Sequence, residues 1–190
     1  MVTVLLTSEQ YFYRCFDTML ISSCDILRQL FKSRWKGITG REWDNSEEDG
    51  KYFSEGVGKK ILKDAVKHQK LKIQSGNIEL WDMTLLSFVL QNFGDPILYK
   101  EENEHVRTLK NLRNDQKHNS DNELTTEEYE VAVTDFIKVL EALKMKNDSA
   151  DAKDFYSILL AKEYDLKMIF KLLHDTTNSE AAILLTKRNK

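Results

Sequence analysis

The chain has 190 residues, of which 41% are hydrophobic and 31% charged, and its formal net charge is −3. One proline and seven glycines are few helix breakers for this length, so the composition favours a globular all-helical protein of one domain with an appendage. The slightly acidic balance excludes a chain-wide electrostatic attraction to nucleic acid, and any RNA binding would depend on a local basic patch.

The first apolar run, residues 2–6, is too short for a signal peptide or a membrane span, so we expect a cytoplasmic protein with no membrane partner. Thr7 and Gln10 form a capping box, which predicts a long helix from there to about Trp35. Cys15 and Cys24 lie within its apolar pattern, which predicts reduced core thiols and no disulfide framework. The residues expected on the buried face of this helix are Phe12, Phe16, Met19, Leu20, Leu27, Leu30 and Phe31.

Residues 36–49 are predicted to form a loop. A second helix is predicted from near Lys51 or Lys59 to Gln74, and Gly76 should end it. Its expected buried positions are Ile61, Leu62, Ala65, Val66, Gln69 and Ile73. Its outer face carries Lys59, Lys60, Lys63, Lys67, Lys70 and Lys72. Such a basic face is most often simply solvated, although it can also guide a polyanion.

Two ligand motifs begin in this region and are incomplete. A calcium loop starting at Asn45 would need a glutamate at its twelfth position, where Gly56 stands. A phosphate loop ending at residues 58–59 would need a glycine in place of Phe53 and a hydroxyl residue in place of Lys60. Because no cluster of acidic, His or Cys residues has metal-ligand spacing, we expect no metal and no cofactor.

Residues 78–81 are predicted to form a short extended entry to the next helix. Asp82 is a good N-cap for a helix over residues 83–93, which is apolar nearly all round and therefore central to its bundle. Gly94 and Pro96 should end this helix.

The helix predicted over residues 101–118 carries the candidate chemistry. Its apolar stripe is Val106, Leu109 and Leu112. Arg113 falls at the edge of that stripe, and Asn114 and His118 are neighbours on one face because they are four residues apart. An Arg offers a planar fork of donors to phosphate oxygens, and a His transfers protons near neutral pH. Together these groups suit metal-free chemistry on a phosphodiester.

A simpler interpretation stays open. Basic side chains in the last turn of a helix are favoured anyway, because they offset the negative end of the helix dipole. An Arg followed by a His four to six residues later also arises easily by chance. On this interpretation the chain is a plain helical domain in which His118 is only a helix-end residue.

Thr125 and Glu128 form a second capping box, which opens a helix to about Met145. The residues expected on its inner side are Tyr129, Val133, Phe136, Ile137, Leu140 and Leu143. Residues 146–152 are predicted to be a linker, followed by further amphipathic helices. The predicted organisation is therefore a helical bundle over residues 1–146 and a C-terminal helical extension over residues 147–190.

The order of these features resembles the HEPN domains (higher eukaryotes and prokaryotes nucleotide-binding). The resemblance rests on the Trp-Asp-Met-Thr-Leu-Leu run at residues 81–86, the Leu-Arg-Asn-x-x-x-His motif at residues 112–118, and the capped amphipathic helix that follows. Within this family, the sequence is similar to the animal subgroup found in a DAZ-interacting RING-type ubiquitin ligase and beside NACHT-type ATPase modules. It covers about residues 8–145, and its implied fold is a four-helix up-down bundle that homodimerises.

The resemblance also implies an activity. In the ribonuclease members, two Arg-x4–6-His motifs meet at the dimer seam and cleave RNA without metal. Carried over to this chain, the catalytic residues are Arg113, Asn114 and His118, and the nearby Lys110 and Lys117 would bind RNA. Many eukaryotic members instead resemble non-catalytic dimerisation or adaptor modules of larger immune or ubiquitin-signalling proteins, and this is the alternative function.

Overall fold

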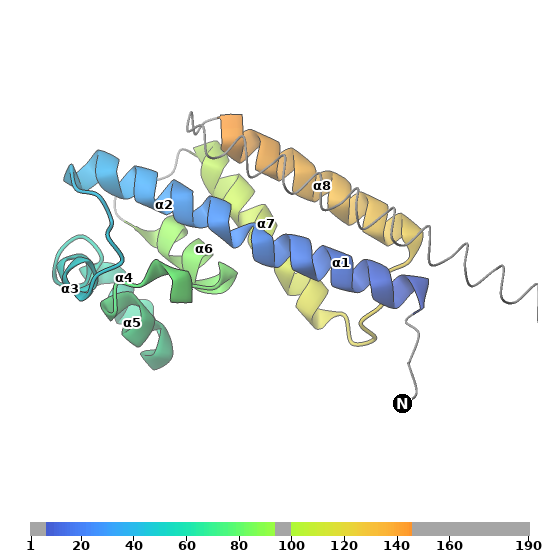
Figure 1. The fold of residues 1–190 in the computed structure, drawn as a ribbon, viewed down its shortest axis with the longest axis horizontal. Coiled ribbons are helices and arrows are strands. Elements are labelled where there is room, and N and C mark those ends of the chain that lie inside the picture. The colour runs from blue at the N-terminus through green and yellow to red at the C-terminus, as the bar shows by residue number, and fades with distance from the viewer. Residues whose placement is uncertain (1–6, 94–99, 146–190) are drawn as a thin grey trace, which may run out of the picture. The chain divides into compact units, whose positions relative to one another are not determined.

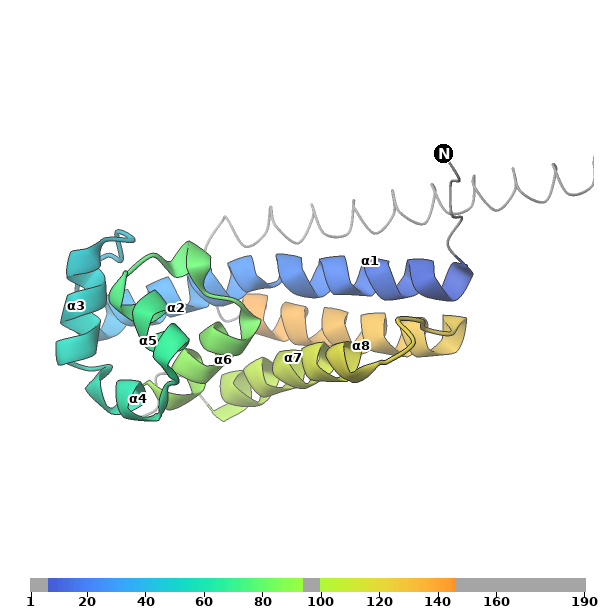
Figure 2. The same cartoon turned by 90° about the horizontal axis from the view of Figure 1, so that it is seen from below.

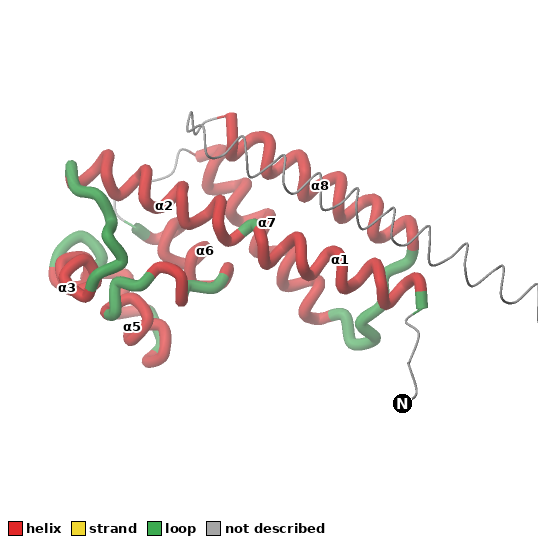
Figure 3. Tube along the Cα trace, viewed as in Figure 1, coloured by secondary structure: helices red, strands yellow, loops and turns green. Residues whose placement is uncertain are grey.

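The computed structural model describes residues 7–93 and 100–145, which all belong to one compact unit, Met1–Ser149. These residues form helices without a strand, so the predicted all-α class is confirmed for them (Figure 3). The helices are α1 (Ser8–Ser22), α2 (Cys24–Thr39), α3 (Glu47–Glu55), α4 (Lys59–Asp64), α5 (Lys67–Gln74), the 3-10 helix η1 (Ile78–Leu80), α6 (Met83–Asn92), α7 (Lys100–His118) and α8 (Thr126–Met145). None of the described helices is long and apolar enough to cross a membrane.

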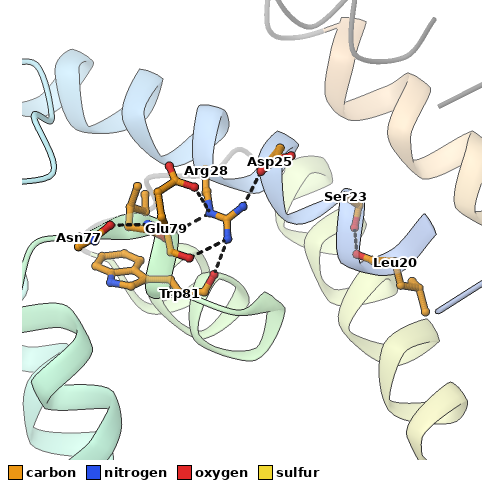
Figure 4. Close-up of polar contacts among 8 residues, drawn as sticks. Leu20, Ser23, Asp25, Arg28, Asn77, Glu79 and Trp81 are labelled. Carbon is orange, nitrogen blue, oxygen red and sulfur yellow. Dashed lines mark hydrogen bonds and ion pairs between the residues drawn. The ribbon is translucent and has the colours of Figure 1, made fainter. Parts of the chain in front are cut away.

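The predicted N-terminal helix is in fact two helices, α1 and α2, which meet at Ser23. The Ser23 hydroxyl is buried and donates a hydrogen bond to the Leu20 carbonyl oxygen at 2.7 Å (Figure 4). A serine that bonds back to the preceding turn commonly bends a helix. The second helix also runs further than predicted, to Thr39, and Gly40 ends it in a left-handed conformation. The predicted loop is therefore shorter than residues 36–49.

The bundle is formed by α1 with α2, by α6, by α7 and by α8 (Figure 1). Contacts at both ends show that α7 runs antiparallel to α1 and α2, since Gln116 bonds Tyr13 while Glu102 pairs with Arg34. In α8 the Tyr129 ring stacks on Phe12 at 4.8 Å, near the start of α1. The helix α6 runs in the same direction as α2, since Cys24 and Met83 line one cleft and the Trp35 ring stacks on Phe93 further along both. The predicted four-helix up-down order is therefore not confirmed.

The prediction of a single helix that ends at Gln74 is wrong, because the chain forms three shorter helices, α3, α4 and α5, in this region. Ala65 and Val66 are extended and separate α4 from α5. The three helices form a small subdomain at one end of the bundle (Figure 2). The chain packs tightly at Gly76, where φ is +68° and an added Cβ would lie 1.7 Å from the Ser46 carbonyl oxygen.

An aromatic cluster joins this subdomain to α2 and α6. Its six rings belong to Phe31, Trp35, Trp43, Phe53, Trp81 and Phe93, all buried. The centroid of the Phe31 ring lies 4.9 Å from that of Trp43 and 5.1 Å from that of Trp81. Aromatic pairs at such distances add stability beyond the area they bury. Residues 78–80 form η1 and not the extended segment that we predicted, and Ile78 and Trp81 are buried.

Three predicted helix starts are confirmed, those at Thr7, Asp82 and Thr125. Thr7 and Gln10 form their capping box, and the Asp82 side chain accepts the amide of Leu85 at 2.9 Å. The amide of Thr125 donates to Glu128 at 2.9 Å, as the second capping box requires. Several predicted features lie outside the described residues and stay predictions. They are the helix end at Gly94 and Pro96, the domain boundary between residues 146 and 147, and the C-terminal helices.

Candidate functional site

The buried stripe of α7 differs from the one expected. Its fully buried members are Glu102, Val106, Leu109 and Gln116, while Leu112 is only half-buried. Arg113 follows Leu109 by four residues, so it lies on this stripe and not at its edge. The guanidinium is half-buried as a result.

Two reciprocal hydrogen bonds fix the last turns of α7 against α1. The Gln116 side-chain amide donates to the Tyr13 carbonyl oxygen at 2.8 Å, and the Tyr13 hydroxyl donates to the Gln116 carbonyl oxygen at 3.2 Å. Gln116 is not among the candidate site residues that the sequence pattern indicates. The available signal was its position seven residues after Leu109, two helical turns further along the same face.

A cleft of about 500 Å³ lies where the junction of α1 and α2 faces residues 79–83 and the C-terminal part of α7. Arg113 and Lys117 both line it. Its apolar lining includes Leu20, Ile21, Leu80 and Met83. Of the five candidate site residues, Asn114, His118 and Lys110 are not among the lining residues.

Arg28 holds one wall of this cleft in place (Figure 4). Its guanidinium pairs with Asp25, lies 3.5 Å from the Glu79 carboxylate and donates to the carbonyl oxygens of Ile78, Glu79 and Trp81, each at 3.2 Å. These contacts satisfy Arg28 and tie η1 to α2. On the same wall, Asp82 lies 3.6 Å from the Lys72 ammonium group.

Three charged residues of the cleft take no part in these ion pairs: Arg113, Lys117 and Asp17. One Arg113 nitrogen, Nη1, donates to the Asn114 side-chain oxygen at 3.2 Å. The other N–H groups of Arg113 have no hydrogen-bond partner among residues 7–93 and 100–145. Within the same residues, neither Lys117 nor Asp17 forms an ion pair. The cleft therefore offers unused donors to an anionic group.

His118 is the last residue of α7, and its side chain is exposed. Five residues after Arg113, it projects about 140° further round the helix, away from the buried stripe. Lys110 and Asn114 are half-buried on the intervening arc. The described chain thus brings Arg113, Asn114 and Lys117 together, and it leaves His118 on the outer surface.

Other reactive groups near the cleft are unsuited to chemistry. Cys24 lines it, but burial raises the pKa of this thiol, so little nucleophilic thiolate forms. Among the described residues, no group of three or more His, Cys, Asp or Glu side chains is placed to hold a metal ion.

Comparison of the chain with protein-family models, with curated proteins and with solved structures found no match. The site must therefore be interpreted from its own geometry and from the motif in the sequence.

Proposed function

We propose that this chain is a metal-independent endoribonuclease of the HEPN type, which works as a homodimer. The observation that carries the proposal is Arg113, a half-buried residue that donates a hydrogen bond to the Asn114 side chain and lines an open cleft beside Lys117. Planar guanidinium donors suit the charge that develops on a phosphodiester during cleavage.

In the proposed reaction the ribose 2′-oxygen attacks the adjacent phosphorus and the 5′-oxygen of the next nucleotide leaves. His118 accepts the 2′-hydroxyl proton or supplies the proton to the leaving oxygen. Arg113 stabilises the negative charge on the phosphoryl oxygens. The products are a 2′,3′-cyclic phosphate and a free 5′-hydroxyl, and Lys110 and Lys117 hold the RNA by its phosphates.

The need for a second protomer follows from the position of His118. Within one chain its side chain does not line the cleft that contains Arg113. A two-fold dimer that packs the ends of two α7 helices together would bring His118 of one protomer to Arg113 of the other. The site is then composite, with one contribution from each chain.

The alternative is a non-catalytic homodimerisation module of a larger immune or ubiquitin-signalling protein. The charge of the cleft favours it. Asp17, Asp25, Glu79 and Asp82 all line the same cleft and would repel a phosphate. On this alternative, Arg113 and His118 contribute to the dimer interface and the wild-type chain does not cut RNA.

Mixing two inactive variants tests the composite site. Arg113→Ala and His118→Ala should each lose RNA cleavage measured in EDTA by about 10²-fold or more. When the two are mixed and allowed to exchange subunits, half of the dimers are mixed and each has one intact site. Activity should then return to about a quarter of the wild-type level.

The control is Asp115→Ala, which changes an exposed neighbour on the same helix. It should retain wild-type cleavage. No cleavage by the wild-type chain, together with a dimer that Arg113→Ala dissociates in light scattering, supports the alternative function. Cleavage that survives His118→Ala, or that requires added metal, would contradict the proposed mechanism.

A further inference from the structure

The outer surface of α4 and α5 concentrates positive charge in a chain that is acidic overall. Residues 59–70 contain five lysines and one aspartate, whereas the whole chain has a net charge of −3. We call these five residues the lysine surface: Lys59, Lys60, Lys63, Lys67 and Lys70. None of their ammonium groups forms an ion pair with another described residue. Lys72 is excluded because it faces Asp82.

Most of the lysines lie on the side of α4 and α5 away from the buried residues. Ile61 of α4 and Ile73 of α5 are buried, at 2% and 0% exposure, and they fix the inner side of each helix. Four lysines of the surface are exposed, and Lys70 is half-buried. The surface is therefore a stable part of the subdomain at the end of the bundle (Figure 2), and none of its residues lines the cleft of Arg113.

Two aliphatic side chains in or next to the same segment are exposed. Val66 is 52% exposed and Leu71 is 61% exposed. The sequence pattern placed Val66 on the buried side of one continuous helix. The extended residues between α4 and α5 change that phase, so Val66 faces solvent instead.

We propose that the lysine surface, with Val66 and Leu71, docks on a bilayer containing anionic phospholipid. The ammonium groups would lie among the lipid phosphates and carboxylates, while the two aliphatic side chains would enter the boundary of headgroups and acyl chains. This combination of lysines with exposed aliphatic residues is typical of peripheral membrane contacts.

RNA suits this surface less well. Proteins that grip single-stranded nucleic acid commonly combine positive charge with aromatic side chains on which bases stack, and arginine stacks in the same way. The chain has no phenylalanine, tyrosine or tryptophan between positions 54 and 80 and no arginine between positions 42 and 106, so His68 is the one ring in that segment. Exposed valine and leucine would gain nothing from a phosphate backbone.

Vesicle co-sedimentation of the full chain tests the proposal. The vesicles are phosphatidylcholine alone and an equimolar mixture of phosphatidylcholine and phosphatidylserine. We expect binding only to the mixture, weakened by salt. Lys63→Gln with Lys67→Gln should weaken binding about 25-fold, at about fivefold for each lysine. Leu71→Ser should weaken it about threefold or more without changing the charge.

The matched control is Lys51→Gln with Lys100→Gln, which removes two exposed lysines outside the lysine surface. It should bind as the wild type does. Equal binding to both vesicles, or equal losses in the control and in the Lys63/Lys67 variant, would overturn the proposal. Unchanged binding of Leu71→Ser would contradict the aliphatic insertion. If the Lys63/Lys67 variant instead loses binding to a labelled uridine oligonucleotide while wild type ignores the vesicles, the surface binds RNA and the membrane proposal is wrong.

Discussion

Tyr13 and Gln116 hold α1 and α7 together through two reciprocal hydrogen bonds, each from a side chain of one helix to the main chain of the other. Gln116 is 4% exposed, so its side-chain amide is shielded from water and donates to the Tyr13 carbonyl oxygen instead. Because the bonds lie three residues from Arg113, they fix the part of α7 that borders the cleft.

We predict that Gln116→Ala lowers the free energy of unfolding by about 1–2 kcal/mol, since it removes one of these bonds and leaves a void. Tyr13→Phe should cost less, about 0.5–1.5 kcal/mol. Urea denaturation measures both. Asp115→Ala, at an exposed position on the same turn, should stay within about 0.5 kcal/mol of wild type. A similar loss in all three variants would mean that the pair has no special role.

A second prediction concerns Arg28, whose guanidinium binds three carbonyl oxygens of residues 78–81. Arg28→Ala should destabilise the protein by about 2–3 kcal/mol, because it leaves these partly buried oxygens without their donor. Arg28→Lys should recover less than half of that loss, since one ammonium group cannot reproduce the planar fork. Urea denaturation gives the size, and amide hydrogen exchange at Trp81 and Leu85 should quicken. Full rescue by lysine would show that only the charge matters.

Backbone geometry makes a third prediction. Gly76→Ala should destabilise by at least about 2 kcal/mol, because its φ of +68° disfavours a side chain and the new Cβ would collide with the Ser46 carbonyl. Gly37→Ala is the matched control, since Gly37 lies in α2 with nothing within 4 Å of an added Cβ. That variant should gain about 0.5–1 kcal/mol. Thermal unfolding of both checks the pair, and equal shifts would refute the steric argument.

The two cysteines provide a prediction for pH. Burial raises the pKa of the Cys15 and Cys24 thiols above their ordinary value of 9.0. The folded state therefore retains these protons at a pH where the unfolded chain has lost them. Their contribution to stability is complete below the ordinary pKa and declines as the pH rises through the higher folded values.

Thermal unfolding between about pH 7 and pH 10.5 should show this decline above about pH 9. The double variant Cys15→Ala, Cys24→Ala should be less stable at pH 7 yet lose less on alkalinisation. A thiol reagent at pH 8 should react slowly with the native protein and rapidly in urea. Rapid reaction of the native protein would show that the thiols are accessible.

Local sequence determined three of the helix starts. Thr7, Asp82 and Thr125 are followed by partners at fixed short spacings, and each cap forms as predicted because its hydrogen bonds join residues three apart. The same locality made the motif at residues 113–118 visible, since Asn114 and His118 are four residues apart and are neighbours on the helix surface. The all-α class followed from the same periodicity.

Contacts between distant residues decided the rest. The division of the predicted helix into α3, α4 and α5 depends on how those segments pack against the aromatic cluster, and the exposure of Val66 follows from that division. The direction of Arg113 into the cleft, and of His118 away from it, follows from the rotation of α7 that Tyr13 fixes through Gln116, 103 residues away. Sequence periodicity sets the angles between neighbours on a helix, whereas the face that turns toward the core depends on the contacts it makes there.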